Sequence, residues 1–140
     1  IVFFNRNKEL SSKKNTKLHI GNFSKMDELD KEILRQAVYE IVNRIPRGRA
    51  TSYGAIARAS GFPNMSRMVG KIMSECDSSK TEIPAHRVVN SQGVLSAKDA
   101  FTDPRGMQAL LEAEGIKVSN DRIINWKKVF WNPIDEIELD

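Results

Sequence analysis

The chain has 140 residues, of which 40% are hydrophobic and 29% charged, a balance typical of one globular domain rather than a fibrous or disordered chain. No apolar run approaches the roughly 20 residues of a membrane span, and the opening Ile-Val-Phe-Phe is too short for a signal-peptide core. The single cysteine, Cys76, excludes an internal disulfide, and the two histidines lie far apart. The composition therefore indicates a soluble intracellular protein without structural zinc or another cofactor.

The formal charge of +4 is unevenly distributed along the chain. Six basic residues against a single acid give residues 1–25 a charge of +5, which leaves −1 for residues 26–140. Low hydrophobicity and high charge predict that residues 1–25 are a disordered basic arm or a non-native extension, and that residues 26–140 form the folded domain.

A basic block occupies residues 41–74, which contain no acid. Such a block is typical of a phosphate-binding surface, and a solvated helix face explains it about equally well. Its members are Arg44, Arg47, Arg49, Arg58, Arg67 and Lys71.

The first predicted helix begins after Asp27 or Asp30, either of which can cap its N-terminus. Apolar residues recur at helical spacing over residues 33–42, and Pro46 ends the pattern. We expect this helix to contribute to the core.

Two short helices follow in the basic block. The first is predicted over residues 55–60 and ends at Gly61, and the second begins at Asn64 or Ser66 and continues to Ser74. Two short helices joined by a tight turn indicate a helix-turn-helix motif, in which residues 64–74 form the recognition helix.

The rest of the chain is predicted to mix extended and helical segments. Residues 83–89 are predicted to be extended and buried beneath the recognition helix, and residues 90–93 form a turn. A further helix is expected over residues 104–114 with Gly115 as its C-cap. Residues 122–133 are apolar enough to pack on the body, but their pattern does not distinguish helix from strand.

Four blocks of sequence carry a specific resemblance: IPRGRATSYGAIA, SRMVGKIM, IPAHRVVNSQGVLS and LLEAEG. Their order and spacing over residues 29–118 resemble the DNA-binding domain of the alkylguanine-DNA alkyltransferases. The resemblance implies a mainly α fold with a small β element, a winged helix-turn-helix-like domain that docks in the minor groove and flips a nucleotide. In that family the cysteine of an Ile-Pro-Cys-His-Arg-Val-Val segment accepts the alkyl group from guanine oxygen-6.

Ala85 occupies the position of the acceptor cysteine. His86 matches the base that generates the thiolate and Glu114 matches the residue that orients it, but a methyl side chain accepts no alkyl group. We expect His86 to have a structural role, with one ring nitrogen hydrogen-bonded to Glu114. We expect Arg87 to bind a carboxylate or a carbonyl. The sequence thus resembles the alkyltransferase-like proteins, which bind alkylated guanine without repairing it and pass the lesion to nucleotide excision repair.

The resemblance also implies DNA contacts. Arg67 matches the arginine finger that replaces the flipped nucleotide, with an ordinary phosphate contact as the alternative. Tyr53 matches the tyrosine that presses on the target's 3′ phosphate, with a core tyrosine as the alternative. Ser66 and Gly70 are small enough for close approach to the minor groove, although helix packing explains them nearly as well, and Lys71 adds positive charge.

The base pocket is expected to involve Pro84, Ala85, Val89 and Lys98. Core packing accounts for Val89 equally well. Lys98 lies where alkyltransferase-like proteins present an arginine over the flipped base, and lysine offers a point charge in place of a stacking plane.

Two alternative functions remain open from the sequence. One is an active alkyltransferase that uses Cys76, and the other is a helix-turn-helix transcriptional regulator. The favoured reading is a monomeric, non-enzymatic protein whose partners are double-stranded DNA containing alkylated guanine and the damage-recognition proteins of nucleotide excision repair, with no membrane involved. It would act in the bacterial cytoplasm and nucleoid or in the eukaryotic nucleus.

Overall fold

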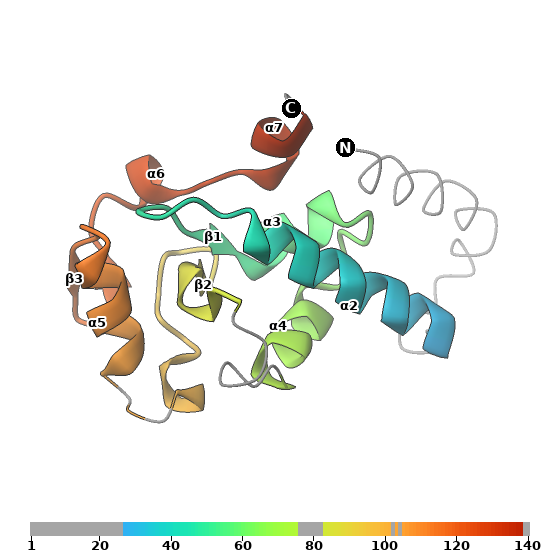
Figure 1. Cartoon of the computed structure of the whole chain (residues 1–140), viewed down its shortest axis with the longest axis horizontal. Helices are drawn as coiled ribbons and strands as arrows, with labels where there is room; N and C mark the ends of the chain where they lie inside the picture. The colour runs from blue at the N-terminus through green and yellow to red at the C-terminus, as the bar shows by residue number, and fades with distance from the viewer. Residues whose placement is uncertain (1–26, 76–82, 102, 104, 139–140) are drawn as a thin grey trace.

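Helices account for most of the structure, and two short sheets complete it (Figure 1). The computed structural model describes residues 27–75, 83–101, 103 and 105–138. The predicted basic arm and Cys76 lie outside these described residues. The mainly α fold with a small β element is therefore confirmed for the described part of the chain.

Helix α2, Glu28–Asn43, begins where the sequence predicts. The Asp27 carboxylate accepts a hydrogen bond from the Asp30 backbone N–H at 2.8 Å, which satisfies one of the free donors of the first turn. The apolar side of the helix, including Leu34, Val38 and Ile41, is fully buried. The periodic pattern thus gives a core helix, as expected.

The helix-turn-helix consists of α3, Tyr53–Ala59, and α4, Ser66–Glu75. The Ser52 hydroxyl caps α3 by accepting from the Ala55 backbone N–H at 3.1 Å, so the helix begins two residues before the predicted start. Gly61, in the turn, has a φ of +90°, a backbone conformation that glycine adopts at little cost.

The segment over residues 83–89 is not extended throughout, which corrects the prediction. A 3₁₀ turn, Ala85–Arg87, interrupts it before strand β2, Val88–Val89. The Ala85 N–H donates to Ile83 O at 2.8 Å and the Arg87 N–H to Pro84 O at 3.0 Å, so local hydrogen bonds replace ladder bonds there. β2 then pairs in parallel with β1, Thr51–Ser52, which precedes α3.

Most of the C-terminal part, including α5 and β3, lies at the left of Figure 1. It begins with a 3₁₀ turn, Lys98–Ala100, and helix α5, Gly106–Ala113, which starts two residues later than predicted. Strands β3, Val118–Ser119, and β4, Arg122–Ile123, form an antiparallel hairpin. The stretch over residues 122–133, whose pattern was ambiguous, contains β4 and helix α6, Trp126–Val129. Helix α7, Pro133–Glu138, begins at its last residue and was not predicted from the sequence.

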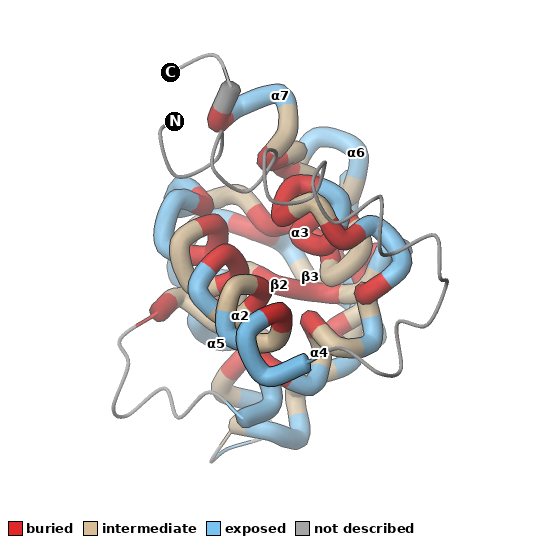
Figure 2. The backbone as a smooth tube through the Cα atoms, turned by 90° about the vertical axis from the view of Figure 1, so that its right-hand side faces the viewer, coloured by how far each residue is buried: buried red, intermediate tan, exposed pale blue. Residues whose placement is uncertain are grey.

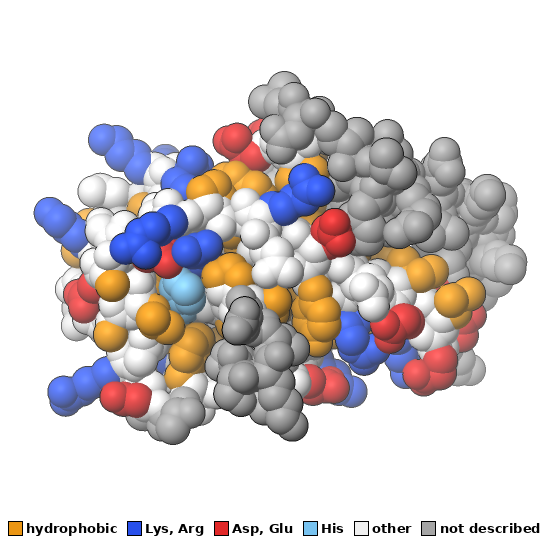
Figure 3. Space-filling model, viewed as in Figure 1, with side chains coloured by type: hydrophobic (Ala, Val, Ile, Leu, Met, Phe, Trp, Pro, Cys, Tyr) orange, Lys and Arg blue, Asp and Glu red, His pale blue; other side chains and the backbone are white. Residues whose placement is uncertain are grey.

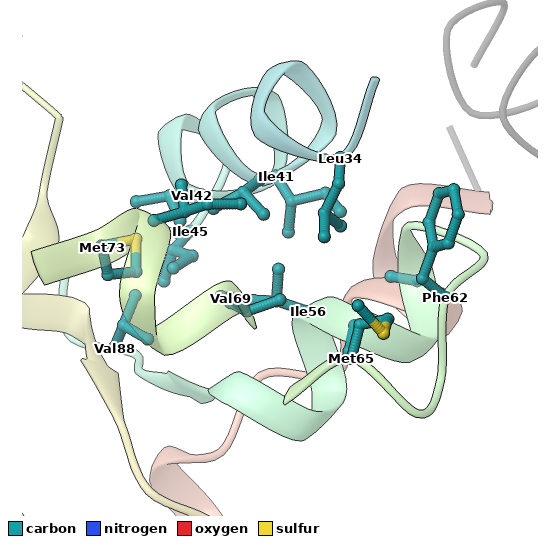
Figure 4. Packing of buried hydrophobic residues seen from close by; sticks show 14 of the residues in the cluster. Leu34, Ile41, Val42, Ile45, Ile56, Phe62, Met65, Val69, Met73 and Val88 are labelled. Carbon is teal, nitrogen blue, oxygen red and sulfur yellow. The ribbon is translucent and has the colours of Figure 1, made fainter. Parts of the chain in front are cut away.

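Two hydrophobic clusters hold these parts together. The larger one joins α2, α3 and α4 to Val88 of β2, and Figure 4 shows Met73 and Val88 facing each other within it. The smaller one surrounds Met107 and Leu111 of α5 and includes Val89. Because Val88 and Val89 point to opposite sides of β2, this strand connects the two clusters, and Figure 2 shows it buried in the interior. Among the described residues, no helix combines the length and the apolar character that crossing a membrane requires.

Candidate nucleic-acid interface

A partly open pocket lies beside the recognition helix. Ala85 lines it, so the position expected for an acceptor cysteine faces the cavity. No side chain among the described lining residues carries a charge. The lining residues are Tyr53, Gly70, Met73, Ser74, Ala85, Val88, Ala97, Ala100 and Phe101.

Tyr53 lies where α3, α4 and the loop after β2 meet at this pocket. It is the first residue of α3, and a Cβ built on Gly70 of α4 would lie 4.0 Å from its ring. Burial raises the pKa of its hydroxyl, while a hydrogen bond with the Ser96 side chain acts in the opposite direction. The tyrosine is thus half-buried at the pocket, between α4 and the loop after β2.

Glu114 is the centre of a hydrogen-bonded cluster behind Ala85. His86 Nε2 lies 2.7 Å from Glu114 Oε2, and Arg87 donates to the same carboxylate through Nε and Nη2, the latter at 2.7 Å. The Gly48 backbone N–H donates to Glu114 Oε1 at 3.0 Å, from a residue whose φ is +85°. Arg87 Nη1 also donates to Ile45 O at 2.8 Å. The predicted partners of His86 and Arg87 are confirmed.

The electrostatics of this cluster favour an ionised carboxylate. Burial acts to raise the pKa of Glu114, whose side chain is only 5% exposed. Hydrogen bonds from Arg87, His86 and the Gly48 backbone outweigh that effect and hold the pKa at about 2. Glu114 is therefore ionised at neutral pH, beside a pocket whose wall includes the methyl group of Ala85.

Helix α4 carries the other residues predicted to contact DNA. Arg67 is exposed, and three residues along the helix from it Gly70 lines the pocket, so the two share a face. Ser66 is half-buried at the first position of the helix. Lys71 lies instead at a second, polar cleft between α2 and α4, beside Lys31 and Arg35.

The basic block divides in the structure, which the sequence did not reveal. Arg47 Nη2 donates to Ala113 O at 2.9 Å, and Arg49 donates to Val129 O at 3.0 Å and to Phe130 O at 2.6 Å. These two arginines fasten the turn before β1 to α5 and α6. Arg58, Arg67 and Lys71 have no side-chain hydrogen bond or ion pair within the part of the chain that the structure describes.

Figure 3 shows a face of the molecule on which a histidine reaches the surface. Orange hydrophobic side chains gather around the pale blue histidine, and blue basic side chains lie next to it. Within the described residues no group of three or more histidine, cysteine or acidic side chains is placed to hold a metal ion.

Three of the four predicted pocket residues do not line the cavity. Val89 is fully buried in the smaller core cluster, and the alternation of β2 turns Val88 toward the pocket in its place. Pro84 is half-buried outside the lining, and Lys98 Nζ binds Asp121 Oδ2 at 2.6 Å. Sequence reasoning missed Met73 and Phe101, and their apolar character offered no signal that separates a pocket wall from a core position.

The comparisons with known proteins agree with this geometry. A family model described as "6-O-methylguanine DNA methyltransferase, DNA binding domain" matches residues 33–116. This is more than half of the chain, and the chain therefore belongs to this family.

Two relatives match most of their own length. A DNA base-flipping protein of Vibrio parahaemolyticus is 36% identical over 69% of this chain and 93% of the relative. Alkyltransferase-like protein 1 of Schizosaccharomyces pombe is 34% identical over 69% of this chain and 92% of the relative. A crystal structure of S. pombe Atl1 in complex with damaged DNA containing O6-carboxymethylguanine superimposes with a TM-score of 0.64 at 31% identity, over 71% of this chain and 95% of that one.

Proposed function

We propose that this protein binds duplex DNA containing an O6-alkylated guanine, holds the flipped base in the pocket beside Ala85, and leaves the alkyl group in place. The observation that carries the proposal is the methyl side chain of Ala85 in a pocket whose neighbouring His86 and Arg87 are both hydrogen-bonded to Glu114. Alkyl transfer requires a nucleophile within bonding reach of the alkyl carbon, and no described lining residue is a cysteine.

The relatives support the same reading. Their names describe base flipping and likeness to an alkyltransferase, and one related protein was solved in complex with DNA that carries an O6-alkylated guanine. A flipped base needs a concave site with apolar walls, which the pocket between α4 and the loop after β2 offers.

The DNA contacts we infer follow the surface of α4. Arg67 is the finger that fills the space left by the flipped nucleotide, and Tyr53 acts on the neighbouring phosphate. Ser66 and Gly70 allow the helix to approach the minor groove, and Lys71 contributes charge at its edge.

A bound lesion that is not repaired has to be removed by other proteins. We infer that the complex is recognised by the damage-recognition proteins of nucleotide excision repair, and that the protein acts as a monomer in the compartment that holds the genome. Incision of a lesion-containing duplex by a reconstituted excision system, measured with and without this protein, tests the inference. Unchanged incision would contradict it.

The proposed binding is tested with two duplexes that differ by one O6-methyl group on guanine. We expect the methylated duplex to bind at least about tenfold more tightly, and the recovered protein to show no gain in mass. A mass gain of one methyl group would overturn the proposal, and its location by peptide mapping would show whether Cys76 had served as acceptor. Equal affinity for the two duplexes would remove lesion recognition altogether.

A further inference from the structure

Lys98 lies next to the pocket but does not line it. It occupies the first position of the 3₁₀ turn Lys98–Ala100, between two residues that line the cavity, Ala97 and Ala100. Its ammonium group lies 2.6 Å from the Asp121 carboxylate, and the hydrogen bond and the charge of Asp121 both raise the pKa of Lys98. The Lys98 ammonium group is therefore bound outside the pocket lining.

Backbone bonds fix the position of that carboxylate. Asp121 lies in the turn between β3 and β4 with a φ of +60°, and its carbonyl accepts from the Leu95 N–H at 2.8 Å. The Ile123 N–H donates to Gly93 O at 2.9 Å on the other side of the turn. The hairpin is thus attached to the start of the same loop that bears Lys98.

The ion pair contributes little to folding stability, because its side chains are 37% and 45% exposed and such pairs are screened by water. The ion pair instead determines where the Lys98 ammonium group lies. A lysine is a charge on a flexible four-carbon stem, so releasing its ammonium group would let it move toward the pocket beside it.

We propose that Asp121 determines the specificity of the pocket by holding the Lys98 ammonium group outside it, so that the pocket favours neutral O6-alkyl adducts over anionic ones. The inference rests on the proposed function. Its physical basis is that an ionised carboxylate loses solvation in an apolar site and regains little without a cation there. Asp121 does not touch the base in this scheme and acts only through Lys98.

Two adducts of the same size separate charge from shape. O6-carboxymethylguanine carries a carboxylate, and O6-carbamoylmethylguanine carries a neutral amide in its place. We expect the native protein to bind the amide duplex roughly tenfold more tightly than the carboxylate duplex. The ratio of the two affinities is the readout, because an inactive fraction of protein lowers both values equally.

Four variants then test the mechanism. Asp121→Asn keeps the side-chain shape and tolerates the positive φ, and we expect it to lower the ratio to about threefold or less by freeing Lys98. Lys98→Met should leave the native ratio near its original value, and the double variant should restore that value. Asp99→Asn removes one negative charge from the same turn without breaking a described hydrogen bond, and we expect it to change the ratio little.

The outcomes distinguish this inference from the proposed function. If neither adduct binds better than unmodified DNA, the proposed function fails. If both adducts bind but Asp121→Asn leaves the ratio unchanged, Asp121 does not set specificity and the inference is overturned. An equal shift in the double variant would also overturn it, because the effect would then not pass through Lys98.

Discussion

The Glu114 cluster and the outer face of α4 are both rich in charged or polar residues, but they use them differently. In the cluster, Glu114 accepts hydrogen bonds from His86, from Arg87 and from the Gly48 backbone. On α4, Arg67 is exposed and has no side-chain partner within the described residues.

This difference separates groups that stabilise the fold from groups available to a ligand. The cluster joins the turn before β1, the 3₁₀ turn Ala85–Arg87 and the end of α5, three segments that are distant in sequence. A cluster with that structural role is needed whether or not a nucleophile lies beside it. The same division runs through the basic block, where Arg47 and Arg49 bind backbone carbonyls and Arg67 does not.

The largest effect should follow from breaking the Glu114 cluster. We expect Glu114→Gln to lower the free energy of unfolding by about 3 kcal/mol, because it leaves the Arg87 guanidinium in a mostly buried site with a weaker partner. Urea denaturation measures the loss. Glu112→Gln, an exposed position on the same helix whose carboxylate contacts Gln108 at 3.4 Å, is the matched control and should change stability little. A loss below 1 kcal/mol at Glu114 would mean that the cluster is not structural.

Acid should remove the same contribution from the native protein. The pKa of Glu114 is about 2 in the folded state, below its value in the unfolded chain, so its contribution is present above about pH 4.5 and is lost as the pH falls toward 2. The expected loss is roughly 3 kcal/mol. Stability curves of the native protein and Glu114→Gln between pH 2 and pH 7 should converge at the acid end. Parallel curves would assign the acid sensitivity to other carboxylates.

Salt dependence tests the division of the basic block. If Arg58, Arg67 and Lys71 are the block's phosphate contacts, about three neutralised phosphates give a slope near −3 in log affinity against log salt, or roughly a 40-fold loss between 50 and 200 mM. Arg47→Gln should reduce stability but leave this slope unchanged, since its guanidinium binds Ala113 O. A slope near −5 that falls with Arg47→Gln would show that Arg47 contacts DNA.

Most of the helices could be predicted from the sequence because local signals specify them. The Asp27 cap, the apolar period of α2 and the Gly-containing turn before α4 each have a physical reading within a few residues. The partners of His86 and Arg87 were accessible through the resemblance of the IPAHRVV and LLEAEG blocks.

The pocket wall was less predictable because it depends on tertiary packing. Strand alternation places Val88 and Val89 on opposite sides but does not say which side is the cavity. The position of the Lys98 ammonium group depends on Asp121, 23 residues further along the chain in the hairpin of β3 and β4. The 3₁₀ turn at Ala85 is likewise held in place by bonds from Arg87 to Glu114 and Ile45, which are distant in sequence.

Among single contacts to DNA, the finger should matter most. We expect Arg67→Ala to weaken binding of the alkylated duplex by about 1–3 kcal/mol and binding of the same single strand much less, because only the duplex has an orphaned cytosine. Stability should stay within about 0.5 kcal/mol. Arg35→Ala removes the same charge from α2, where Arg35 pairs with Glu32, and serves as the control. Equal losses on duplex and single strand would make Arg67 an ordinary phosphate contact.

The smallest effect is expected for Gly70→Ala, which should raise stability but weaken binding. A Cβ on Gly70 would meet only the Tyr53 ring, at an ordinary 4.0 Å, so Gly70→Ala should raise stability by about 0.5–1 kcal/mol through its better helix propensity. The same methyl group enters a face that lines the pocket, and we expect it to weaken lesion binding by about 1 kcal/mol.

Gly54→Ala in α3 is the matched control, because Gly54 is helical but does not line the pocket. Thermal unfolding and lesion-duplex titration of both variants measure the two effects. If Gly70→Ala gains stability and keeps full affinity, the small residue serves helix packing alone and DNA does not approach α4 at that position. If Gly70→Ala loses both stability and affinity, the methyl group disturbs the fold. Residues that stabilise the fold and residues that bind DNA would then not be separate at this position of α4.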